Sequence, residues 1–167
     1  MPVTRDIRES YRKPAQVMRR LLADGQREDR ALAILMGGAF LAFLFQLPRL
    51  SRQAHLQGED LTGLMANTLF ACLFFLPLIF YGIAAVTHII ARIFGGKGTW
   101  YGARLALFWS FLAASPLMLL NGLVAGLVGD GVQLQIVGLL WFLVFGAFWF
   151  INLRVAESAV EPDVATP

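Results

Sequence analysis

The side chains best suited to bind a charged ligand lie on either side of a glycine-rich segment. His88 and Arg92 are four residues apart, a spacing that puts both on one face of a helix. Lys97 lies within the segment and Arg104 follows it. Brought together, the four would form a basic pocket for the phosphate of an anionic lipid headgroup or for a partner's carboxylate. A simpler interpretation stays open, in which the arginines anchor helix ends at the headgroups and His88 bonds a neighbouring carbonyl group.

Residues for catalysis or metal binding do not occur in a recognisable pattern. The chain has two histidines and one cysteine, without the His-Glu-x-x-His run or cysteine pair that would indicate a metal site. The segment GGKGTWYG lacks the Lys-Ser/Thr ending of a phosphate-binding loop. An intramembrane enzyme would require His88, Ser110 or Ser115 to converge with a base. We therefore expect a protein that is not an enzyme and has no cofactor and no metal.

The elements that must position these residues are membrane-spanning helices. Hydrophobic residues make up 57% of the chain and charged residues 15%, against about 25% charged in ordinary soluble domains. The chain contains uncharged apolar runs that are long enough, as helices, to cross the ~30 Å hydrocarbon core of a bilayer, although the shortest run only just reaches this length. The second run is too short for two spans and a turn, so it predicts one long helix. We expect an all-α bundle of about four transmembrane helices, at residues 31–47, 61–91, 105–129 and 132–153.

Lys and Arg residues are distributed unequally around these runs, which predicts the orientation. Eight lie before the first run, three between the second and third, and one after the last, giving twelve on one side of the membrane. Only two lie on the other side, between the first and second runs. The positive-inside rule then places both termini in the cytoplasm of a multi-pass inner-membrane protein. Because topology accounts for the basic excess, we expect no nucleic-acid partner.

The chain divides into a cytoplasmic basic segment at 1–30, a transmembrane domain at 31–153 and a tail at 154–167 that we expect to be disordered. In the first segment, Pro14 separates an irregular start from an amphipathic helix, whose apolar stripe faces either the headgroup surface or the protein's own cytoplasmic loops. The stripe consists of Val17, Met18, Leu21 and Leu22.

Prolines and small residues predict how the spans bend and pack. Pro48 should end the first span, and Pro77 and Pro116 should kink the second and third. Small residues four apart let helix backbones approach closely, either within the bundle or in a dimer. Such pairs are Gly122 with Gly126, Gly38 with Ala42, and Ala33 with Gly37.

The segment FYGIAAVTHIIARIFGGKGTWYGARLALFWSFLAASPLMLL resembles the Yip-one family of Ypt/Rab-interacting membrane proteins, in a short bacterial form. The shared elements are a helix ending at the pair Gly95 and Gly96, a loop of aromatic and small residues, a basic residue at the next helix start, here Arg104, and a midspan proline, here Pro116. The resemblance implies a cytoplasmic N-terminus, a multispan fold and no enzymatic activity. Family members commonly have five spans, so here either one is absent or the long second run is misread. Eukaryotic relatives associate with small GTPases, a role that fold alone does not transfer.

These observations favour a noncatalytic membrane protein that organises membrane or recruits a partner through its basic cytoplasmic face. The expected partners are the bilayer and its anionic headgroups, with a second copy of the chain or another membrane protein as further alternatives. A small oligomeric transporter or channel is the competing interpretation. It would require a water-filled path lined by Asn67, His88, Ser115 and Asn121.

Overall fold

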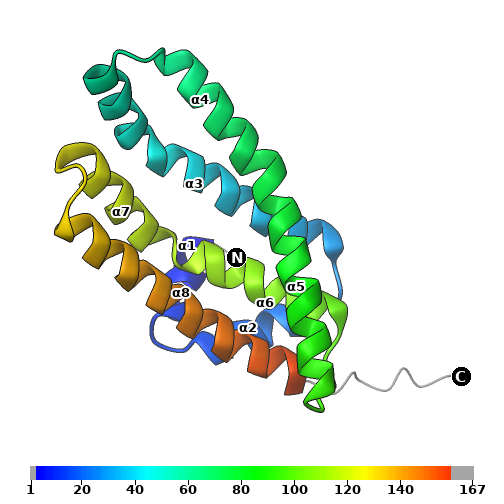
Figure 1. The fold of residues 1–167 in the computed structure, drawn as a ribbon. Helices are drawn as coiled ribbons and strands as arrows, with labels where there is room; N and C mark the ends of the chain where they lie inside the picture. Colours follow the sequence, from blue (N-terminus) through cyan, green and yellow to red (C-terminus); the bar gives the residue numbers. More distant parts are fainter. Residues whose placement is uncertain (1–2, 159–167) are drawn as a thin grey trace, which may run out of the picture.

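The computed structural model describes residues 3–158 and is helical throughout, with no strand in that range, which confirms the all-α prediction (Figure 1). Three helical segments are long and apolar enough to cross a membrane, and the pair α6 and α7, bent by 46°, gives a fourth candidate when taken as one span. The count of about four spans is therefore confirmed. The elements are α1 (Val3–Ser10), α2 (Pro14–Ala23), α3 (Glu28–Gln57), α4 (Leu61–Phe70), η1 (Ala71–Phe75), α5 (Leu76–Ile93), α6 (Trp100–Ala113), α7 (Ser115–Leu127) and α8 (Val132–Ser158).

The first span is longer than the uncharged run that predicts it. Helix α3 passes through Pro48 and ends at Gln57, so the expectation that Pro48 closes the span is wrong. A proline removes one backbone donor but leaves the other bonds of the ladder intact, and packing can hold the helix together. The chain turns at Gly58, whose φ of 68° lies in the left-handed region that favours glycine.

The second apolar run forms one continuous helical segment, as predicted, from Leu61 to Ile93. The side chain of Asp60 caps its start by accepting hydrogen bonds from the backbone amides of Thr62 and Gly63. The π-helical turn η1 ends two residues before Pro77, where the ladder lacks a backbone donor.

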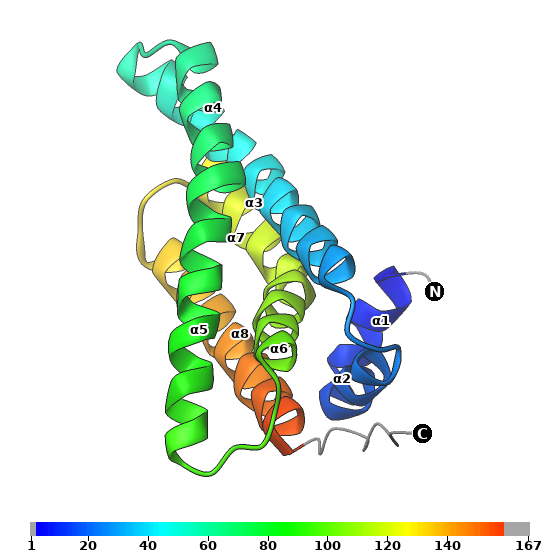
Figure 2. The same ribbon diagram turned by 90° about the vertical axis from the view of Figure 1, so that its right-hand side faces the viewer.

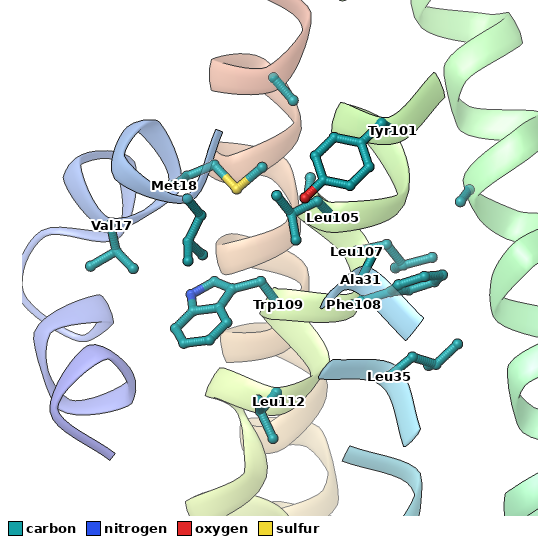
Figure 3. Close-up of a cluster of buried hydrophobic side chains, with 14 residues drawn as sticks. Val17, Met18, Ala31, Leu35, Tyr101, Leu105, Leu107, Phe108, Trp109 and Leu112 are labelled. Carbon is teal, nitrogen blue, oxygen red and sulfur yellow. The ribbon is translucent and has the colours of Figure 1, made fainter. Parts of the chain in front are cut away.

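Helix α6 is the centre of the bundle. Every residue from Tyr101 to Ala113 is buried except Arg104. It packs against α3, α5 and α8, and it also contacts α1. The close-up in Figure 3 shows Trp109 on this helix directed toward the two N-terminal helices. The apolar core therefore forms around α6, and the remaining spans expose their outer faces.

Small residues set the closest helix contacts. A Cβ atom at Gly122 would overlap the carbonyl oxygen of Phe45, and one at Gly126 would meet Pro48. These two glycines thus seat α7 directly on the backbone of α3, beside the proline that α3 carries. A Cβ atom at Gly38 would lie 2.9 Å from the Phe111 ring of α6. The contacts are within one chain, as the bundle-packing interpretation requires.

The two N-terminal helices form a cap, residues 3–23, at one end of the bundle (Figure 2). The loop between α5 and α6 and the end of α8 lie at this same end. The apolar stripe of α2 is buried in the protein's own core, with Val17 and Met18 fully enclosed. Of the two alternatives for this stripe, packing within the protein is the one observed, although against helices α6 and α8 rather than loops. The expected irregular start is also wrong, because α1 is helical.

The last span continues beyond its expected end. Helix α8 runs to Ser158, so a disordered tail starting at residue 154 is predicted too early. The helix persists because Ala156 and Glu157 are buried against the rest of the bundle. The remainder of the predicted tail, 159–167, lies outside the described residues.

Replacing Gly122 by Leu should separate α7 from α3. The new side chain has no room against the rigid backbone at Phe45, so we expect the free energy of unfolding to fall by about 3 kcal/mol. Unfolding by a denaturing detergent, followed by circular dichroism, measures the change. Gly146→Leu is the control, since a Cβ atom at Gly146 meets nothing within 4 Å. Equal stability of the two variants would contradict the packing described here.

Candidate functional site

His88 is the centre of a buried polar contact that joins three parts of the chain. Its Nδ1 lies 2.7 Å from Oε1 of Glu157, and both side chains are almost fully buried. The other carboxylate oxygen, Oε2, accepts a hydrogen bond of 3.1 Å from the backbone amide of Gly98. The indole ring of Trp100 covers His88, with ring centroids 4.5 Å apart. We call this group the His88–Glu157 latch, because it ties α5, the glycine-rich loop and the end of α8 together.

In the latch, the buried polar groups serve as hydrogen-bond partners for one another. An ionised carboxylate only accepts hydrogen bonds, so with Glu157 ionised the shared hydrogen is on Nδ1 of His88. The loop is held by its backbone too, since the amide of Lys97 donates to the carbonyl oxygen of Glu157 over 2.9 Å. A Cβ atom at Gly98 would overlap this segment of α8. The loop is glycine-rich here because the backbone must approach α8 this closely.

Sequence analysis missed Glu157, which it assigned to a disordered tail. The two partners are 69 positions apart, so no local spacing connects them. The usable signal was indirect: a histidine inside an apolar run needs a partner when buried, and Glu157 is the acid that follows the last apolar run.

The four predicted binding residues do not converge on one pocket. His88 and Arg92 line the same cavity, of about 360 Å³, together with Trp100. Arg104 instead pairs with Glu28 at the start of α3, and its guanidinium lies 5.9 Å from the Tyr81 ring. The side chain of Lys97 is exposed. Arg92 is the arginine that lines this cavity, while one ring nitrogen of His88 is engaged by Glu157.

A different basic surface covers the cap. Its acidic residues turn inward: Asp6 is buried and lies 2.6 Å from a guanidinium nitrogen of Arg20, which also bonds Glu9 over 3.2 Å. The other basic residues of the cap turn outward and form no ion pair within residues 3–158. We call this set the cap surface: Arg5, Arg8, Arg12, Lys13 and Arg19.

Side-chain contacts attach the cap to helices α6 and α8 of the bundle. The indole nitrogen of Trp109 donates to Oγ of Ser10 over 3.1 Å, and the hydroxyl of Ser10 donates to the carbonyl oxygen of Asp6. Tyr11 packs edge-on against Phe148 of α8, and burial raises the pKa of its hydroxyl. The cap is therefore a fixed part of the fold, with its cations in defined positions.

The remaining polar groups of the spans serve helix packing. The amide of Asn152 donates to Oγ of Ser110 over 2.9 Å, joining α8 to α6, and Ser110 donates to the carbonyl oxygen of Ala106. No cluster of three or more metal-ligating side chains occurs in the part of the chain that the structure describes.

The residues of the predicted transport path lie apart. Asn121 lines a cavity of about 280 Å³ between α3, α7 and α8, whereas His88 lines the one beside Trp100. Asn67 is exposed on α4, and Ser115 is buried at the junction of α6 and α7. The geometry therefore offers no argument for a common path through one copy of the chain.

A sequence profile described as "Yip1 domain" matches residues 8–158. No curated protein and no solved structure matched the chain. The matched range includes the second helix of the cap, all spans and the latch.

Removing the Glu157 carboxylate should weaken the latch. In Glu157→Ala, the buried ring of His88 and the amide of Gly98 lose their partner, and each buried group left unsatisfied costs about 1 to 3 kcal/mol. We expect a clear decrease in melting temperature in detergent. Ser158→Ala is the control, since that exposed hydroxyl bonds only within its own helical turn. Identical melting of both variants would show that the latch carries no stability.

Proposed function

The chain belongs to the Yip1 domain family of membrane proteins, and we propose that it is a noncatalytic inner-membrane protein that organises anionic lipid or recruits an acidic partner through its cap surface. The family match confirms the resemblance carried by the glycine pair and the midspan proline. Of the two basic regions that the sequence indicates, the N-terminal segment and the glycine-rich loop, we assign the recognition to the N-terminal helices.

The observation that carries the proposal is the separation of charge within the cap. Asp6 and Glu9 form ion pairs with Arg20, so the outward-facing side of the cap keeps an excess of positive charge. Each basic residue near an anionic membrane surface contributes about 1 kcal/mol of attraction. Rigid attachment through Trp109 and Ser10 adds to this, because fewer side-chain and backbone freedoms are lost on binding.

The cytoplasmic placement of this surface follows from the charge distribution. The cap end carries the eight basic residues before Ala31, the three from Arg92 to Arg104, and Arg154, whereas Arg49 and Arg52 lie at the other end. Such a bias retains the basic end in the cytoplasm during insertion. In the proposed topology, both termini of the chain therefore lie in the cytoplasm.

The outer faces of the spans fit a lipid environment or a neighbouring membrane protein. Helix α5 exposes Leu78 and Ile93, and α8 exposes Ile136 and Phe142. Apolar faces of this kind are stable against acyl chains. A second copy of the chain or another membrane protein could cover part of them without involving the cap surface.

Neutralising the cap surface should abolish recognition of anionic groups. The protein is placed in phosphatidylcholine nanodiscs and mixed with vesicles containing phosphatidylglycerol, or with a fluorescent poly-glutamate peptide. We expect at least a tenfold loss of affinity when Arg5, Arg8, Arg12, Lys13 and Arg19 are all changed to Gln. Binding by the unaltered protein should also weaken above ~0.15 M salt.

Two controls accompany this experiment. Arg49→Gln removes a cation from the opposite end of the bundle and should bind as the unaltered protein does. Vesicles of phosphatidylcholine alone should not be captured. If the variant with all five substitutions binds both probes with the affinity of the unaltered protein, the cap surface is not the recognition site.

Reporter fusions test the orientation. A fluorescent protein that matures only in the cytoplasm should be bright when fused after Pro167 and dark when inserted at Asp130, in the turn between α7 and α8. An enzyme active only outside the cytoplasm should give the reverse pattern. Fluorescence from the Asp130 insertion alone would overturn the proposed topology.

A further inference from the structure

A cavity of about 900 Å³ lies between the cap and the spans α3 and α6. We propose that it binds one glycerophospholipid, with the phosphate among arginines at the headgroup level and an acyl chain along α3. Its volume lies within the range of about 300 to 1,000 Å³ found for small-molecule sites. The site is separate from the cap surface, since none of the five cap-surface residues lines it.

The polar end of the cavity can hold a phosphate. Arg20, Arg27 and Arg30 all line it. In residues 3–158, the Nε–H of Arg20 is buried and has no hydrogen-bond partner. Arg27 and Arg30 each use one terminal nitrogen, toward Asp29 and Asp24 respectively, so further donors remain on every guanidinium. A phosphate oxygen would satisfy the buried Nε–H, and arginine forks suit phosphate geometry.

Carboxylates in the same lining select for a small headgroup of low net charge. Asp6 and Asp24 line the cavity beside the arginines, so its charged end is mixed rather than strongly basic. A single phosphodiester matches this balance, whereas a headgroup with several negative charges would meet repulsion.

The apolar wall can hold an acyl chain. Ala33 and Gly37 line the cavity on α3, followed by Phe40 and Leu41, while Leu112 lines it from α6. A Cβ atom at Gly37 would meet nothing within 4 Å, so this glycine leaves open space instead of seating a helix. The pair Ala33 and Gly37, predicted as a packing contact, thus forms the floor of a groove.

The depth of the groove matches one leaflet. From Arg30 to Leu41, α3 rises about 16 Å at 1.5 Å per residue. Half of a ~30 Å hydrocarbon core is about 15 Å. With the arginines at the level of the lipid phosphates, Leu41 would lie near the depth of the acyl-chain ends. Figure 2 shows the cap beside the first turns of α3, where such a lipid would be enclosed.

Photocrosslinking tests the proposal on the full-length protein in nanodiscs. The probe is a phosphatidylglycerol with a photoreactive diazirine on its acyl chain, and mass spectrometry locates the adducts. We expect adducts on residues 33–41 and 109–112, and we expect Gly37→Leu, which fills the groove, to reduce them about tenfold. Gly82→Leu is the matched control, because Gly82 is an exposed helical glycine with equally open surroundings.

A second arm isolates the phosphate. Arg27→Gln should reduce the adducts at least threefold, while Arg19→Gln, which alters an exposed arginine outside the cavity, should not. Unlabelled phosphatidylglycerol or phosphatidylethanolamine should compete with the probe, and diacylglycerol should compete poorly. Equal adducts in Gly37→Leu and Gly82→Leu would overturn the site, and equal competition by diacylglycerol would overturn phosphate recognition. Because Gly37→Leu and Arg27→Gln leave all five residues of the cap surface unchanged, this test can fail while the proposed function stands.

Discussion

The structure depends on the complete burial of α6. A helix enclosed on all sides offers no face to lipid, so the other spans and the cap must pack around it. The contact is close where side chains are small, as at Gly38 beside Phe111. Between apolar helices in lipid, close van der Waals packing is the main attraction, since lipid tails already satisfy apolar surface.

Polar groups at the cap end follow from the same burial. Helices that converge on α6 bring His88 and Glu157 out of water, and each then requires the other. The cap reaches the core through Trp109 and Ser10, and this fixes which of its charges turn inward. Pairing Asp6 with Arg20 stabilises the cap and leaves the exposed cations of the cap surface uncompensated. Charge for recognition is thus a consequence of how the acids are buried.

The cap has two electrostatic sides with different chemistry. Its outer side carries the five basic residues of the cap surface and suits an extended anionic surface. Its inner side combines both signs of charge above an apolar groove and suits a single amphiphile. A lipid held at the inner side would add apolar contacts between α3 and the cap. The two interactions draw on different arginines, so neither requires the other.

The sequence alone determined the membrane class, the span count and the family, because long uncharged runs and their basic flanks have no other stable environment. It also indicated His88 as a candidate binding residue, and the glycines of α7 as packing residues. The pairing of His88 with Glu157, the inward turn of Asp6 and the open space beside Gly37 were decided by tertiary structure. Each joins residues far apart along the chain or depends on which face of a helix is covered. Local spacing carries no information about either, since a small residue that seats one helix on another looks the same in sequence as one that leaves a groove.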